Sequence, residues 1–169
     1  MDLERELLKE HSKSQTIKIA RYIGNQPERF NILINLMLNG SYTITQRASW
    51  VVSCCSDNHP ELIQPHLTAV IRNLKKPVHD AVKRNTLRLL QNISIPKKLH
   101  GITTDLCFKF LISTKEPVAV KAFAMTILYR ITLTEPDLKN ELRIIIEDQM
   151  PYSSPGFLSR GKKIISLLK

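Results

Sequence analysis

Prolines recur at nearly even intervals through most of this 169-residue chain. From residue 60 onward, successive members of this series are separated by 17, 19, 21, 19 and 19 residues; they are Pro60, Pro77, Pro96, Pro117, Pro136 and Pro155. Proline is favoured at the first position of a helix, because the N–H group that it lacks would have no partner inside the helix. The spacing therefore predicts a helix start about every 19 residues and a two-helix unit about every 38 residues, which is typical of a helical solenoid.

The apolar residues between the prolines have helical spacing. After Pro27 they are Phe30, Leu33, Ile34, Met37 and Leu38, which places them on one side of a helix with 3.6 residues per turn. Residues 118–128 are apolar on almost every side, as expected for a helix packed between neighbours. No stretch alternates apolar and polar residues between glycine turns, so we expect no sheet. The sequence predicts an all-α protein.

The successive units can also be aligned with one another. Residues 80–90 match residues 118–128, and the turns 60–62 and 136–138 both consist of Pro, an acidic residue and Leu. This pattern resembles HEAT and armadillo-type repeats over nearly the whole chain. The resemblance implies an α-α superhelix, a short solenoid of antiparallel helix pairs whose second helices line a concave surface.

We therefore predict a single HEAT-like repeat domain over residues 1–169. Its approximate repeats are 1–40, 41–76, 77–115 and 116–154, followed by a terminal capping helix, 155–169. Pro65 leaves two alternatives for the second repeat. Either residues 60–64 form a short extra turn and the helix begins at Pro65, or that helix starts earlier and is kinked.

The composition fits a protein that folds without cofactors. It is 43% hydrophobic and 24% charged, and no apolar run approaches the roughly 18 residues of a membrane span. The charged start, residues 1–4, is unlike a secretion signal. The three cysteines lie in apolar surroundings without a Cys-x-x-Cys spacing, so we expect buried thiols rather than a zinc site with Asp57 and His59. We expect a cytoplasmic monomer without metal or other cofactors.

No catalytic arrangement is recognisable in the sequence. The five histidines fall mainly at turns and helix starts, and neither a nucleophile elbow nor a phosphate-binding glycine loop occurs. Residues 150–156 contain, in a different order, the elements of the serine-rich loop of the fumarase and adenylosuccinate lyase superfamily. The chain is too short for that superfamily's central bundle. We therefore expect no enzyme, and in particular no lyase.

The basic charge is concentrated in one repeat. The chain has 25 Lys plus Arg against 15 Asp plus Glu, and residues 77–115 contain seven of the former against two of the latter. This excess predicts a candidate basic patch, extended by the end of the preceding helix, that consists of Arg72, Lys75, Lys76, Lys83, Arg84, Arg88, Lys97, Lys98 and Lys109. Such clusters attract acidic segments and phosphate backbones.

These observations predict a non-enzymatic scaffold that binds another protein or an acidic peptide through its concave face, with no small-molecule substrate. The alternative is nucleic-acid binding, related to DNA repair, through the basic repeat. HEAT-like alkylpurine DNA glycosylases place an aromatic residue, an Asp and an Arg in their cleft, and Trp50, Asp57 and Arg84 are residues of these types. We expect Trp50 to belong to the core instead, because the chain has few aromatic residues to expose.

Overall fold

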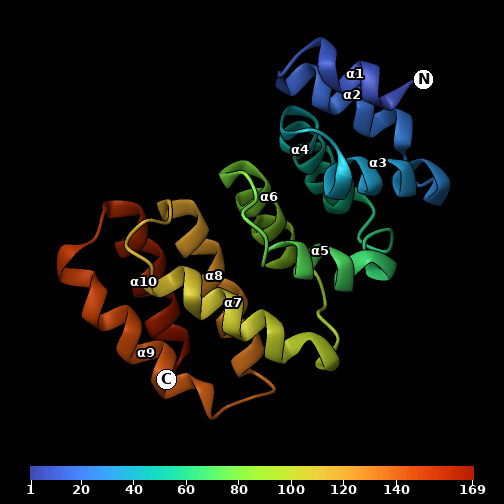
Figure 1. Ribbon diagram of the computed structural model, residues 1–169. Coiled ribbons are helices and arrows are strands. Elements are labelled where there is room, and N and C mark those ends of the chain that lie inside the picture. The colour runs from blue at the N-terminus through green and yellow to red at the C-terminus, as the bar shows by residue number, and fades with distance from the viewer. The chain divides into compact units, whose positions relative to one another are not determined.

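The computed structural model describes residues 1–169 as ten α-helices with three short 3₁₀ turns and no strand (Figure 1). The α-helices are α1 (Leu3–Lys9), α2 (Lys13–Ile23), α3 (Pro27–Asn39), α4 (Tyr42–Asn58), α5 (Leu67–Asn73), α6 (Asp80–Leu90), α7 (His100–Ile112), α8 (Val118–Thr132), α9 (Leu138–Gln149) and α10 (Pro155–Leu167). The prediction of an all-α chain is confirmed.

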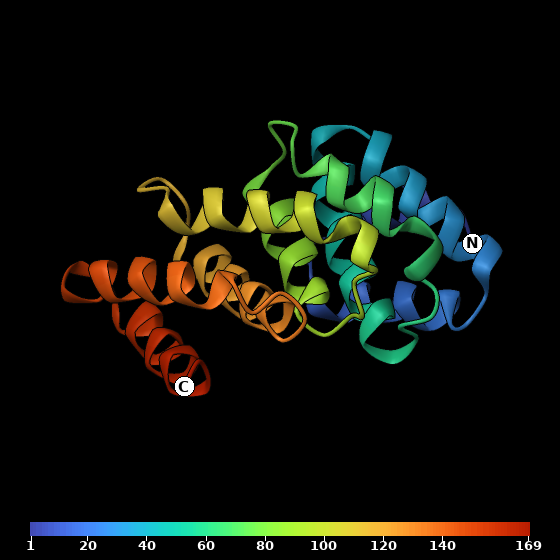
Figure 2. The ribbon, with the colours of Figure 1, turned by 90° about the horizontal axis from the view of Figure 1, so that it is seen from below.

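The helices form two compact units, Met1–Leu89 and Leu90–Lys169. In the first unit, α4 is the central helix and packs against α1, α2 and α3. In the second unit, α8 has the same role and contacts α7, α9 and α10 (Figures 1 and 2). The predicted burial of residues 118–128 on most sides is confirmed, because Val120, Ala124, Met125 and Leu128 are all fully buried.

The prolines lie at or shortly before helix starts, but not always at the predicted position. Pro27 and Pro155 occupy the first helical turn of α3 and α10. Pro117 is instead the residue that precedes α8, with φ −58° and ψ 150°. A residue in this capping position has an extended conformation and an N–H group outside the helical ladder, so proline fits there as well.

The segment around Pro65 follows the first of the two predicted alternatives. Residues 60–63 form a turn, Pro65 lies in the 3₁₀ turn Gln64–His66, and α5 begins directly afterwards at Leu67. The helix therefore starts two residues later than predicted and contains no proline kink. The predicted repeat boundaries at residues 40, 76, 115 and 154 fall between helices, and the division into repeats of a single domain stays a prediction.

The N-terminal helix is attached through a buried carboxylate. Glu6 on α1 is only 8% exposed, and it accepts hydrogen bonds from Lys9, from Lys18 Nζ at 2.9 Å and from Gln15 Nε2 at 3.0 Å. The bonds from Lys9, then Lys18, then Gln15 lower the pKa of Glu6 to about 2. The ionised carboxylate therefore links α1 to α2.

We expect the stability of the first unit to fall as the pH decreases from about 4.5 towards 2. The pKa of Glu6 is lower in the folded chain than its usual value of 4.5, so its contribution is complete above pH 4.5 and is lost as the pH falls through the folded pKa. Urea unfolding at several pH values measures this, with Glu6→Gln expected to remove part of the dependence. Glu4→Gln, an exposed change on the same helix, is the control; equal acid sensitivity of Glu6→Gln and wild type would contradict the assignment.

Candidate functional site

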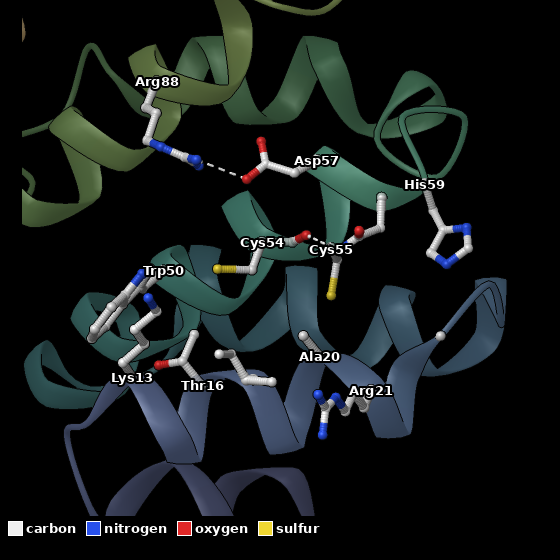
Figure 3. Close-up of a pocket in the computed structure, with 13 residues that line it drawn as sticks. Lys13, Thr16, Ala20, Arg21, Trp50, Cys54, Cys55, Asp57, His59 and Arg88 are labelled. Atoms are coloured by element: carbon white, nitrogen blue, oxygen red, sulfur yellow. Dashed lines mark hydrogen bonds and ion pairs between the residues drawn. The ribbon is translucent and has the colours of Figure 1, made fainter.

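A groove of about 950 Å³ runs between α2 and α4 in the first unit (Figure 3). Helix α2 contributes Lys13, Ile17 and Arg21 to its wall, and α4 contributes Trp50 and Asp57. Arg88 from α6 also lines it. We call this feature the α2–α4 groove. The family resemblance implied a binding surface on the second helices, whereas α4 is the first helix of the predicted repeat 41–76.

Helical spacing explains why these side chains share one wall. Trp50, Cys54 and Asp57 are separated by four and three residues, which places them on one face of α4. Two small residues, Ala20 on α2 and Gly24 directly after it, also line the groove. Gly24 has φ +52° and ends α2, with its N–H donating to the Ala20 carbonyl at 2.9 Å.

An ion pair joins α6 to α4 at the groove. Arg88 Nη2 lies 2.8 Å from Asp57 Oδ2, and Arg88 Nη1 donates to Ser53 Oγ at 2.5 Å. One turn earlier on α6, the buried Asn85 donates to Ser49 Oγ at 3.0 Å. Asp57 is the only acidic residue that lines the groove, and its charge is compensated by Arg88. The remaining charge of the lining is therefore positive.

Trp50 lies on the groove wall and is half-buried, so the expectation that it belongs to the core is wrong. Its neighbours Ala48, Val51 and Val52 take the buried positions of α4, and successive helical residues point about 100° apart. The ring of His11 meets the indole edge-on, with centroids 5.6 Å apart and an interplanar angle of 80°. An edge-to-face arrangement of this kind is one of the favoured geometries of two aromatic rings.

The cysteine thiols are poor nucleophiles in this environment. Burial raises the pKa of Cys54, which lines the groove, and raises that of Cys55 to about 12. Burial also raises the pKa of Cys107. Cys55 and Cys107 are buried as predicted, whereas Cys54 is half-buried. These thiols are protonated at neutral pH, and the thiolate is the form that attacks substrates and binds metals.

No zinc site forms around Asp57 and His59. Asp57 pairs with Arg88, and His59 Nδ1 lies 3.4 Å from Glu61 Oε1 instead. In residues 1–169, no three His, Cys, Asp or Glu side chains are grouped so that they could hold a metal ion. A structural zinc site usually needs four such ligands arranged around the ion.

The residues of the predicted basic patch are divided between the two units. Arg72, Lys75, Lys76, Lys83, Arg84 and Arg88 belong to the first, whereas Lys97, Lys98 and Lys109 belong to the second. Arg72, Lys75, Lys76 and Arg84 are exposed. Arg88 reaches into the α2–α4 groove, and the Lys83 side chain is only 14% exposed, with Nζ 3.9 Å from Asp80 Oδ1. That the patch forms one binding site stays a prediction.

Sequence reasoning missed the two other cations of the groove, Lys13 and Arg21. They lie in the first repeat, where six basic and five acidic residues nearly balance, so counting charge by repeat gave no signal there. Their separation of eight residues, which places both on one side of a helix, is the sequence pattern that indicates a shared basic surface. Of the glycosylase-like trio, the structure brings Trp50 and Asp57 into one groove, but the arginines there are Arg21 and Arg88, not the exposed Arg84.

A comparison with protein families matches residues 3–167 of the chain to the HEAT repeat domain family. The chain therefore belongs to the HEAT repeat family, whose members are generally non-catalytic helical scaffolds that bind other proteins. No curated protein and no solved structure is significantly similar to it. None of its helices combines the length and the apolar character needed to cross a bilayer.

Proposed function

We propose that this chain is a non-enzymatic scaffold that binds an acidic segment of another protein in the α2–α4 groove. The observation that carries this proposal is the charge of the groove lining. Lys13 and Arg21 line the groove and are exposed to solvent, and the only acidic lining residue is already paired with Arg88. A carboxylate-bearing ligand would complement this surface.

The spacing of the cations indicates what such a ligand would contain. Lys13 and Arg21 lie eight residues apart on α2, or about 12 Å along the helix axis. An extended peptide covers that distance with about four residues. Ile17 and Trp50 line the groove as well. The ligand that fits best is an extended segment with two acidic residues about four positions apart and an apolar residue between them.

A site-specific crosslinking experiment tests this function in the cells that produce the chain. A photo-crosslinking amino acid at position 17 should capture proteins through acidic peptides, because Ile17 lines the groove. The same amino acid at Asn35, an exposed position on α3, is the matched control. Mass spectrometry of the crosslinked peptides identifies what was captured. Equal capture from both positions, or capture of nucleic acid alone, would contradict the proposal.

Charge reversal in the groove should reduce capture at position 17. We expect Arg21→Glu to weaken binding by about tenfold, because it replaces an attraction to a carboxylate with a repulsion. Arg21 is exposed, so folding should be preserved, which circular dichroism checks. Arg5→Glu, an exposed change on α1 outside the groove lining, is the matched control. Identical binding by the two variants would show that the groove is not part of the binding interface.

Nucleic-acid binding is the second candidate, favoured by the exposed cations Arg72, Lys75, Lys76 and Arg84 of the first unit. Fluorescence anisotropy with single-stranded and duplex oligonucleotides tests it. Phosphate contacts would make the affinity fall steeply with salt concentration, and neutralising Lys75, Lys76 and Arg84 would reduce the slope. Weak binding that is insensitive to these substitutions would exclude this patch as a nucleic-acid interface.

A further inference from the structure

A second depression, of about 460 Å³, lies in the unit Leu90–Lys169, where the segment after α6 meets α8. Its floor is formed by four aliphatic residues, Leu90, Ile93, Ile127 and Ile131, which each expose 3% or less of their surface. Its rim is open to solvent and consists of the exposed residues Ser94, Lys97, Leu133 and Thr134. A volume of this size lies within the range of sites that bind small molecules.

Arg130 has unused hydrogen-bond donors in the lining of this depression. Its Nη1 donates to the carbonyl oxygens of Gln91 at 2.6 Å and Ile93 at 2.9 Å, which holds the segment after α6 against α8. A guanidinium group has five N–H donors. The Nε and Nη2 groups of Arg130 donate to no protein atom and are not sealed from solvent. They are therefore available to a ligand.

The charge of the lining is entirely cationic. Lys97 lies on the rim and is exposed, and His100 and Arg130 complete the set of titratable groups. No Asp or Glu lines the depression. Lys97 and His100 also line a neighbouring depression, which contains the carboxylates Asp105, Glu135 and Asp137. Glu135 Oε1 lies 3.5 Å from His100 Nδ1. A ligand with an anionic group would complement the lining.

We propose that this depression binds the free C-terminus of a partner protein, with the carboxylate at Arg130 and Lys97 and an apolar last side chain on the floor. The aliphatic floor would contact the side chain of the partner's last residue. The adjacent cations would bind its carboxylate. The open rim gives the rest of the partner chain a path into solvent. This proposal is independent of the α2–α4 groove, because the residues involved belong to the other unit.

Methyl NMR of the full chain tests this with three small probes. N-acetyl-Val-Leu carries the free carboxylate, its C-terminal amide lacks the charge, and octanoate carries a carboxylate on a plain alkyl chain. We expect the acid to shift the methyl signals of Ile93, Ile127 and Ile131 in a saturable way. The amide should bind about tenfold or more weakly, because it loses the charge-assisted hydrogen bonds.

Variants of two adjacent lysines distinguish binding at this depression from nonspecific attraction of an anion to a basic protein. Lys97 lines the depression, whereas its exposed neighbour Lys98 does not. Lys97→Gln should weaken binding of the acid about threefold or more, and Lys98→Gln should leave it unchanged. The proposal is overturned if the isoleucine methyls do not shift, if the amide binds as tightly as the acid, or if octanoate binds more tightly than the peptide. It is also overturned if the two lysine variants bind alike.

Discussion

Replacing Met125 with Asp should lower the free energy of unfolding by about 4 kcal/mol or more. Met125 is fully buried on α8, the helix that contacts α7, α9 and α10. The substitution removes apolar contacts worth about 2–5 kcal/mol when lost completely, and it buries a carboxylate without a partner. Because whole domains are stable by only about 5–15 kcal/mol, much of the folded population should be lost.

Urea unfolding followed by circular dichroism measures this effect. Ile144→Asp is the matched control, because Ile144 is an apolar residue that is 48% exposed on α9. That variant should change the free energy of unfolding by less than about 1 kcal/mol. Met125→Leu, which preserves volume and apolar character, should cost less than about 1.5 kcal/mol. Equal unfolding midpoints for Met125→Asp and Ile144→Asp would refute the assignment of the buried face.

Replacing Leu87 with Pro should break α6 and cost about 3 kcal/mol from the backbone alone. Leu87 is fully buried in the interior of this helix, so proline removes a helical hydrogen bond, clashes with the preceding turn and also loses the leucine contacts. Arg88, which follows it directly, pairs with Asp57 of α4 at the α2–α4 groove. The substitution should therefore disturb the groove as well as the helix.

Comparison with Leu87→Ala separates the two parts of this effect. Alanine keeps the helical backbone and loses only packing, at a cost of about 2–5 kcal/mol. Proline should be more destabilising than alanine by about 3 kcal/mol, the difference in helix-interior propensity. Circular dichroism and urea unfolding of both variants measure this difference. Equal midpoints and equal helix content would show that residue 87 does not lie inside a helix.

Features that depend on neighbouring residues were predictable from the sequence. The apolar spacing after Pro27 predicted the buried face of α3, where Phe30, Leu33 and Met37 are inaccessible to solvent. Helix formation and amphipathicity are local, with a period of 3.6 residues, so a single segment contains the signal. The position of Pro117 before α8, rather than inside it, was less predictable because both positions accommodate proline.

The candidate site depended on contacts that no single segment reveals. The exposed side of Trp50 and the choice of Arg88 over Arg84 follow from how α4 meets α2 and α6. Helices pack by fitting side-chain ridges into grooves, so a small change in crossing angle alters which residues meet. The charge excess of residues 77–115 predicted a basic site that includes α6. It did not predict that Lys13 and Arg21 on α2 line the same groove as Arg88.

The sequence by itself determined that this protein is an all-α chain with HEAT-like repeats, because prolines and apolar spacing act within each helix. It also predicted the burial of Met125, which lies in the apolar segment 118–128 and is inaccessible to solvent. Only the tertiary structure decided where ligands could bind. The α2–α4 groove combines residues from positions 13 to 88, and the depression at Arg130 exists because that side chain holds a segment nearly 40 residues away in sequence. Such long-range contacts form by packing between helices, for which local sequence patterns provide no signal.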